Sequence, residues 1–341
     1  MVFLSLRLGR FKIFMLIFAL LFTQASIADE GAIPCDASTG CSQSVFTSGA
    51  APSTETTIVV QDWGNASQSC AILMLHGLIH SHLNWIKQIT DPNLRAKCRI
   101  VTMDTRGHGA SGKPADIAAY SSANFAADVA KVIDELNLES HNKFIVVSHS
   151  YGTLVLNDYL TSLLPSGPSA IPFDGIVYEG GIYIFVPPIN DPTPPGFVSQ
   201  GITPAFFALD VGSRILGTNV FIQSLFNGEL PLSLKNTMLA YDMIVEPAIR
   251  GNILGRVNPF GPLGFSGPPA PANVIMPFIS GKKVMIAHGE KDVVFAKETA
   301  ALAASLSGAQ LVLYPGSGHT PHLELSEPYN NQLLNFINSL P

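Results

Sequence analysis

Short apolar runs alternate with stretches of helical periodicity along most of the chain, beginning near Thr56. A short apolar run predicts a buried strand, so this alternation indicates βαβ units and a mainly parallel α/β sheet flanked by helices. Strands are predicted over residues 56–60, 71–75, 100–103, 144–147, 175–179, 283–287 and 310–313. Helices are predicted over residues 122–136, with Ser121 or Ser122 as N-cap, and over 297–306 and 328–340.

The interval 182–280 interrupts this alternation. It holds fourteen of the 25 prolines, and such a density breaks strands and long helices. We therefore predict an inserted helical lid, or cap, over 182–280, with short helices at 204–209, 213–226 and 232–244. The catalytic core then consists of residues 56–181 and 281–341.

The N-terminal segment has the features of a signal peptide. Basic residues at positions 7, 10 and 12 precede ten apolar residues at 13–22, and small or polar residues follow up to Ala28. We expect residues 1–28 to be cleaved off, leaving 29–55 as an N-terminal arm of a secreted or periplasmic protein. The alternative is an uncleaved membrane anchor, but ten helical residues span only ~15 Å of a ~30 Å hydrocarbon core.

Composition and charge narrow the class of partner. The 341 residues are 47% hydrophobic and 13% charged, which is too apolar for a disordered protein. The formal net charge of -6 becomes -9 without the leader, and no run of Lys or Arg is present, so nucleic acid is not an expected partner. No stretch beyond the leader reaches the ~18 apolar residues of a membrane span, so no stable span is expected after cleavage.

The four cysteines, Cys35, Cys41, Cys70 and Cys98, all lie in the N-terminal third. This distribution fits an exported protein with two disulfides, for which three pairings exist. If residues 1–28 are not a signal peptide, free buried thiols are the alternative. A short loop closed by Cys35 and Cys41 is favoured within the Ser/Thr/Gly-rich arm. The arm has little apolar pattern and is otherwise predicted to be loosely packed.

The strongest chemical signal is a sharp turn that follows the predicted strand at 144–147. The residues Ser148-His149-Ser150-Tyr151-Gly152 match a nucleophile elbow, in which the positions two before and two after the nucleophile must be small. Ser150 is therefore the candidate nucleophile. A pentapeptide of this kind also occurs by chance, so it needs partners elsewhere in the chain.

Two such partners follow in the chain order Ser, acid, His. Asp292 comes after the strand predicted at 283–287, and His319 comes after the one at 310–313. Both lie beyond the carboxyl ends of parallel strands, where α/β sheets carry their sites. In this mechanism His319 takes the proton of Ser150, Asp292 orients the imidazole, and water hydrolyses the acyl-enzyme, with no metal or organic cofactor.

The oxyanion of such a mechanism needs preorganised donors. The turn after the strand at 71–75 suggests the backbone N–H groups of Leu78 and Tyr151 as the oxyanion hole. Glu179 is an alternative candidate for the triad acid, and His322 is a rival of His319 as the base. Three histidines close in sequence lack the spacing of metal ligands and are expected to line or support the oxyanion loop: His76, His80 and His82.

Five segments in order carry a resemblance to a known family: HG at 76–77, DTRGHGASGKP at 104–114, SHSYG at 148–152, GEKD at 289–292 and GSGHTPHLELSEP at 316–328. The chain resembles the α/β-hydrolase superfamily, in the branch of epoxide hydrolases, haloalkane dehalogenases, cofactor-free haloperoxidases and small esterases. The resemblance implies a lid after the sixth strand, and a structural turn around Asp104, Arg106 and His108. Ser148 departs from the family, which more often has Gly there.

The strand order of that family also bears on the disulfides. It places the strand near Ala71 beside the one near Ile100, so Cys70 and Cys98 would fall within the ~4.4–6.8 Å Cα separation of a disulfide. We therefore favour Cys70–Cys98 as the second pair.

The expected function is that of an exported serine hydrolase acting on a small apolar carboxylic ester or lactone. Phenylalanines in the interval 182–280 favour an apolar acyl or aryl group. A serine at the elbow argues against epoxide hydrolase and dehalogenase chemistry, whose relatives have Asp there. Amidase or aminopeptidase, C–C bond hydrolase and perhydrolase activities use the same triad and stay open, as does a non-catalytic binding protein of this fold. The oligomeric state is not predicted.

Overall fold

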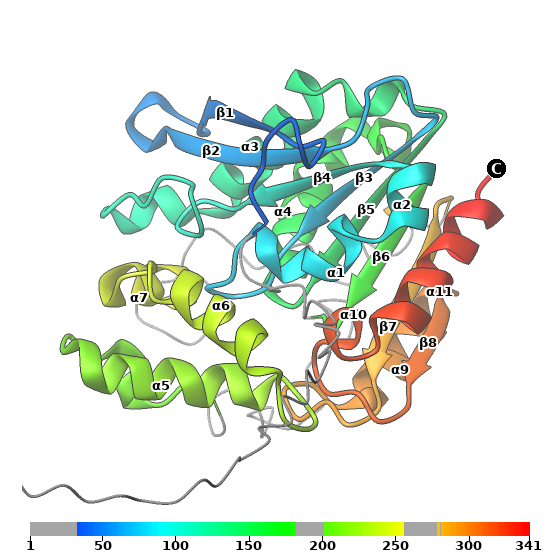
Figure 1. Cartoon of the computed structure of the whole chain (residues 1–341). Coiled ribbons are helices and arrows are strands. Elements are labelled where there is room, and N and C mark those ends of the chain that lie inside the picture. Colours follow the sequence, from blue (N-terminus) through cyan, green and yellow to red (C-terminus); the bar gives the residue numbers. More distant parts are fainter. Residues whose placement is uncertain (1–32, 182–200, 256–277, 280) are drawn as a thin grey trace, which may run out of the picture.

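The computed structural model describes residues 33–181, 201–255, 278–279 and 281–341 (Figure 1). Within them, eight strands form one sheet in the order β1-β2-β4-β3-β5-β6-β7-β8. β1 and β2 are antiparallel to each other, as are β2 and β4, and the remaining neighbours are parallel. The expectation of a mainly parallel sheet is therefore confirmed. The strands are β1 (Ser42–Ser48), β2 (Thr56–Trp63), β3 (Cys70–Leu75), β4 (Arg99–Asp104), β5 (Lys143–His149), β6 (Gly175–Glu179), β7 (Lys283–Gly289) and β8 (Gln310–Tyr314).

Each of the seven predicted strands is present, and each has ends within a few residues of the prediction. β3 and β4 are buried along their whole length. Strands covered on both faces read as continuous apolar runs, and this is why the sequence pattern located them.

The first strand was not predicted, and the expectation of a loosely packed arm is wrong here. β1 has few apolar residues, and Val45 is 55% exposed. It is held instead by a regular antiparallel register with β2, from Ser42 opposite Asp62 to Ser48 opposite Thr56. Main-chain hydrogen bonds at a sheet edge leave little trace in an apolar pattern.

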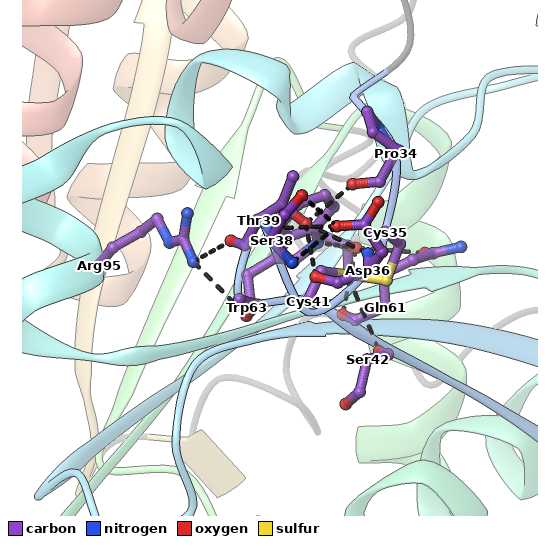
Figure 2. Close-up of a disulfide and its surroundings, with 12 residues drawn as sticks. Pro34, Cys35, Asp36, Ser38, Thr39, Cys41, Ser42, Gln61, Trp63 and Arg95 are labelled. Carbon is purple, nitrogen blue, oxygen red and sulfur yellow. Dashed lines mark hydrogen bonds between the residues drawn. A yellow bond between two sulfur atoms is a disulfide. The ribbon is translucent and has the colours of Figure 1, made fainter.

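Two disulfides hold the N-terminal third, and their pairs are those favoured from the sequence. Cys35 is bonded to Cys41, and Cys70 to Cys98, with Cα separations of 4.8 and 4.5 Å. Figure 2 shows the first disulfide with Arg95 reaching toward its loop; the Arg95 guanidinium donates to the Thr39 carbonyl at 2.7 Å. The second joins the start of β3 to the residue before β4.

Helices lie on both faces of the sheet (Figure 1). α3 (Ser122–Glu135) begins at the predicted N-cap Ser121, whose side chain accepts from the Asn124 N–H. It packs on α4 (Tyr151–Leu163), while α1 (Ile86–Ile89) contacts α2 (Pro92–Lys97), α10 (Pro321–Glu324) and α11 (Ser326–Ser339). α9 (Lys297–Ser307) packs on β7 and β8 and ends at Gly308, as expected. Short 3-10 helices are η1 (Pro52–Thr54), η2 (His82–Trp85), η3 (Ile117–Tyr120), η4 (Leu138–Ser140), η5 (Leu164–Ser166) and η6 (Pro168–Ala170).

A separate group of helices connects β6 to β7. It contains η7 (Pro204–Phe207), α5 (Val211–Ser224), α6 (Leu232–Asp242) and α7 (Pro247–Gly255). The first three were predicted, η7 and α6 with ends two residues too long and α5 two residues too far along the chain, whereas α7 was not. In Figure 1, α5, α6 and α7 lie together beside the sheet rather than on either helical layer. The predicted leader and residues 182–200 and 256–277 lie outside the described residues.

In the part of the chain that the structure describes, no helix has both the length and the apolar character needed to cross a bilayer.

Candidate active site

Ser150 lies on the turn between β5 and α4, in a backbone conformation that few non-glycine residues adopt. Its φ is 51° and its ψ is -117°, and such strain persists only where the surroundings enforce it. The Ser150 N–H donates to the Glu179 carbonyl at 2.9 Å. A Cβ at Gly152 would lie 2.3 Å from the Leu75 carbonyl oxygen, so only glycine fits there.

Ser148 is accommodated at the position where the family more often has glycine. It is fully buried, and its hydroxyl donates to the Val177 carbonyl of β6 at 3.1 Å. A small side chain that satisfies its own polar group therefore replaces the hydrogen atom of glycine without opening the turn.

The loops after β7 and β8 bring Asp292 and His319 together. The two loops are in main-chain contact, because the Lys291 N–H donates to the Ser317 carbonyl at 2.8 Å. His319 Nδ1 lies 2.8 Å from Asp292 Oδ2, and both side chains are almost completely buried. Because a carboxylate only accepts, Nδ1 carries the proton and Nε2 is left as the acceptor.

The environment of Asp292 keeps its side chain ionised. Burial raises the pKa of Asp292, but the charge and hydrogen bond of His319, together with His288 and a backbone N–H, outweigh it, so the pKa lies below its ordinary value. Its second oxygen, Oδ1, accepts from the N–H groups of Val294 at 2.7 Å and Phe295 at 3.1 Å. These two bonds aim Oδ2 at His319.

Ser150 and His319 face a common small cavity of about 20 Å³, which is room for about one water molecule. Among the described residues, His319 Nε2 is buried without a hydrogen-bond partner. The other walls are mainly apolar and come from the loop after β3, from the segment before η7, from the C-terminal end of α5 and from the segment after β7: Leu78, Gly201, Ile202, Phe221, Ser224, Leu225 and Val294.

The two residues predicted for the oxyanion hole are a cavity-lining residue, Leu78, and the chain neighbour of Ser150, Tyr151. Leu78 lines the cavity, on the turn that follows β3. Tyr151 directly follows Ser150 as the first residue of α4. The first-turn N–H groups of a helix also carry its positive dipole end, which favours a developing negative charge.

The alternative acid and base form a pair of their own. His322 Nδ1 lies 2.6 Å from Glu179 Oε1, and His322 Nε2 lies 3.0 Å from the Asn84 carbonyl oxygen. Glu179 thus engages His322 rather than His319. Among the described residues, His149, Glu179 and His322 lie close enough together to share a metal ion. Hydrogen bonds already occupy both ring nitrogens of His149 and both of His322.

The other polar clusters have structural partners. His76, His80 and His82 each contact a different group, so they do not converge on one point: His76 the Gly77 carbonyl, His80 Asp242, and His82 Asp104. Arg106 forms a fully buried ion pair with Asp128 at 2.6 Å, in the expected turn.

Comparison with known proteins identifies the family of this chain. The model of the alpha/beta hydrolase family matches residues 72–331, which is most of the chain. The chain belongs to the alpha/beta hydrolase family.

Individual relatives of this alpha/beta hydrolase have several activities. It is 26% identical over 270 residues to a protein assigned as a non-heme chloroperoxidase in Synechocystis sp., covering 78% of this chain and 90% of that one. The solved structure of a protein assigned as an aryl esterase in Burkholderia cenocepacia has 26% identity and a TM-score of 0.68, covering 86% of this chain and 98% of that one. A match to the EphD oxidoreductase of Mycobacterium bovis is 36% identical over 89 residues, but spans 26% of this chain and only 14% of that protein.

The sequence did not reveal how the C-terminal end of α5 is hydrogen-bonded to the loop after β8 that carries His319. The Leu225 carbonyl, just after α5, accepts the N–H of His319 at 2.8 Å. Two further bonds lie nearby: the Asn227 N–H donates to Glu324 at 2.8 Å, and its amide donates to the Gly316 carbonyl at 2.9 Å. No motif signals such contacts, because they join atoms of residues that lie 89 to 97 positions apart in the chain.

Proposed function

We propose that the protein is an exported serine hydrolase that cleaves a carboxylic ester or lactone through an acyl-enzyme on Ser150. One arrangement carries the proposal: Asp292 fixes the Nδ1 proton of His319, whose Nε2 is without a partner among the described residues and whose ring shares a small apolar cavity with Ser150. A base in this tautomer can accept the proton of a serine hydroxyl.

The reaction then proceeds in two stages. Ser150 Oγ attacks the substrate carbonyl carbon while His319 Nε2 takes the hydroxyl proton, and the oxyanion binds the N–H groups of Leu78 and Tyr151. The tetrahedral intermediate expels the alcohol, which receives the proton from His319. Water, deprotonated by His319, attacks the acyl-enzyme; the bond between the acyl carbon and Ser150 Oγ then breaks, His319 returns the proton to Oγ, and the acid and free Ser150 are released.

The substrate class follows from the walls of the cavity. Leu78, Ile202, Phe221, Leu225 and Val294 present apolar surface next to Ser150, and apolar walls favour a small uncharged ester or lactone over a charged one. In this proposal the helices between β6 and β7 act as the lid over the site. The predicted leader and the two disulfides support export to an oxidising compartment.

The proposal is tested by replacing the nucleophile. Ser150→Ala should lower p-nitrophenyl ester turnover by several orders of magnitude and abolish covalent labelling by a fluorophosphonate. Ser162→Ala, at the exposed end of the same helix, is the matched control and should keep both. Turnover by Ser150→Ala near the wild-type rate would refute the mechanism, and an unlabelled wild-type protein would favour the non-catalytic alternative.

A second candidate activity is favoured by the relative assigned as a chloroperoxidase. In a perhydrolase, hydrogen peroxide replaces water in the second stage, attacks the acyl-enzyme and releases a peracid with free Ser150. Adding peroxide to the ester assay and measuring peracid separates this activity from hydrolysis, and Ser150→Ala should abolish both.

A further inference from the structure

Three imidazole rings lie one behind another beside the cavity. The ring centroids of His319 and His149 are 4.9 Å apart, and those of His149 and His322 are 4.8 Å apart. His149 immediately precedes Ser150 at the end of β5, and His322 lies on α10. All three rings are buried, yet the proposed mechanism uses only His319.

Hydrogen bonds define the tautomer of His149. Its Nε2 lies 3.1 Å from the carbonyl oxygen of His319, and a carbonyl can only accept, so Nε2 carries the proton. Its Nδ1 lies 3.3 Å from the Asn84 amide nitrogen, which donates to it. Burial, followed by the neighbouring His322 and His319, lowers the pKa of His149 well below its ordinary value, so the ring is neutral.

Residues behind His149 hold it in this state. His322 is fixed between Glu179 and the Asn84 carbonyl, and its backbone N–H also donates to Glu179 Oε1 at 3.2 Å. The ring of Trp85 covers His322 at a centroid distance of 4.6 Å. Asn84 therefore contacts both rings: its main-chain carbonyl accepts from His322, and its side-chain NH₂ donates to His149.

The peptide groups of His319 are bonded on both sides. Its N–H donates to Leu225, and its carbonyl accepts from His149. With Asp292 on Nδ1, these contacts fix the main chain and one ring nitrogen, and Nε2 has no hydrogen-bond partner among the described residues. The ring of His149 also packs against the imidazole, at a centroid distance of 4.9 Å.

We propose that His149 is a positioning residue for His319: its Nε2–H holds the carbonyl of the base, and the Glu179–His322 pair with Asn84 holds His149. The inference rests on the proposed role of His319 as the base. His149 does not touch the reacting atoms and acts only through the position of His319.

Two variants of His149 separate this role from simple packing. His149→Met fills the space but has no donor, whereas His149→Gln can place an amide N–H near the position of Nε2. We expect His149→Met to lower kcat by about 10- to 100-fold with KM within about twofold, because a small misplacement of a catalytic group costs rates of this order. His149→Gln should recover most of kcat.

Controls keep the outcome interpretable. Val129→Ala removes buried volume from α3, which contributes no residue to this network, and shows what lost packing alone does to kcat at a similar loss of stability. A His149→Met enzyme with kcat within twofold of wild type, or a His149→Gln enzyme as slow as His149→Met, would overturn the proposal.

A measurement on the wild-type protein does not depend on any variant folding. ¹⁵N NMR at neutral pH should show His149 with a protonated Nε2 and an unprotonated Nδ1; the opposite tautomer or a doubly protonated ring would overturn the proposal. If Ser150→Ala remained active, the proposed function itself would fail. Loss of activity in Ser150→Ala, together with full activity in His149→Met, would remove only the positioning role.

Discussion

Replacing Asp292 by Asn tests whether the tautomer of His319 sustains the reaction. Asp292 Oδ1 accepts from the N–H groups of Val294 and Phe295. The asparagine carbonyl must take over both bonds, so its NH₂ group faces His319 Nδ1. That nitrogen must then accept, the proton moves to Nε2, and the base can no longer take the proton of Ser150.

The magnitude follows from the two possible amide orientations. Flipping the amide would restore an acceptor for His319, but it would leave two backbone donors without partners, at about 1–3 kcal/mol each when buried. The flipped form therefore costs about 2–6 kcal/mol, and 2 kcal/mol corresponds to about 30-fold in rate. The unflipped form has the wrong tautomer, for which a loss of about 10⁴-fold is expected. We expect kcat to fall by at least about 30-fold and by up to about 10⁴-fold.

The assay is steady-state hydrolysis of p-nitrophenyl acetate together with the rate of fluorophosphonate labelling, and both should fall in parallel. Glu290→Gln is the matched control, because Glu290 lies two residues away, is partly exposed and has its carboxylate paired with Lys297. Circular dichroism establishes that both variants are folded. A loss smaller than about tenfold in a folded Asp292→Asn enzyme would refute this assignment of the proton.

Two further predictions concern stability. Burial lowers the pKa of His76 to about 4, so between pH 6.5 and 4 the unfolded chain binds more protons at this residue than the folded chain, and the free energy of unfolding falls as the pH falls. Between pH 7.5 and pH 5, urea unfolding of His76→Gln should therefore show a decrease in the free energy of unfolding that is about 2 kcal/mol smaller than in wild type; equal decreases would contradict this. Replacing both cysteines by alanine should lower the free energy of unfolding by about 3.6 kcal/mol for Cys70–Cys98 and about 2.2 kcal/mol for Cys35–Cys41, from loop separations of 28 and 6 residues; the reverse order in urea midpoints would contradict the loop-closure argument.

The sequence was informative where the signal is local. β5 is a continuous apolar run and the turn at Ser150 needs small residues at fixed offsets, so both could be located from neighbouring positions alone. Asp292 and His319 follow strands in the same way, and the parallel sheet brings such ends together.

Contacts between distant segments were not accessible in this way. β1 depends on main-chain pairing with β2, and its exposed face carries no apolar pattern. The setting of His149 needs Asn84 and His319, which are 65 and 170 residues away. A histidine at the second position of the elbow has no recognisable role until these partners are known.

The bond between the Leu225 carbonyl and the His319 N–H has a consequence for altering the substrate range. Leu225 belongs to the cavity wall, and the same peptide anchors the histidine. Exchanging a side chain such as Phe221 reshapes the cavity without moving this peptide. An insertion or deletion within α5 shifts the carbonyl and displaces His319 with it. Recombination of this segment between relatives should therefore change selectivity and turnover together, whereas point substitutions on its inner face can change selectivity alone.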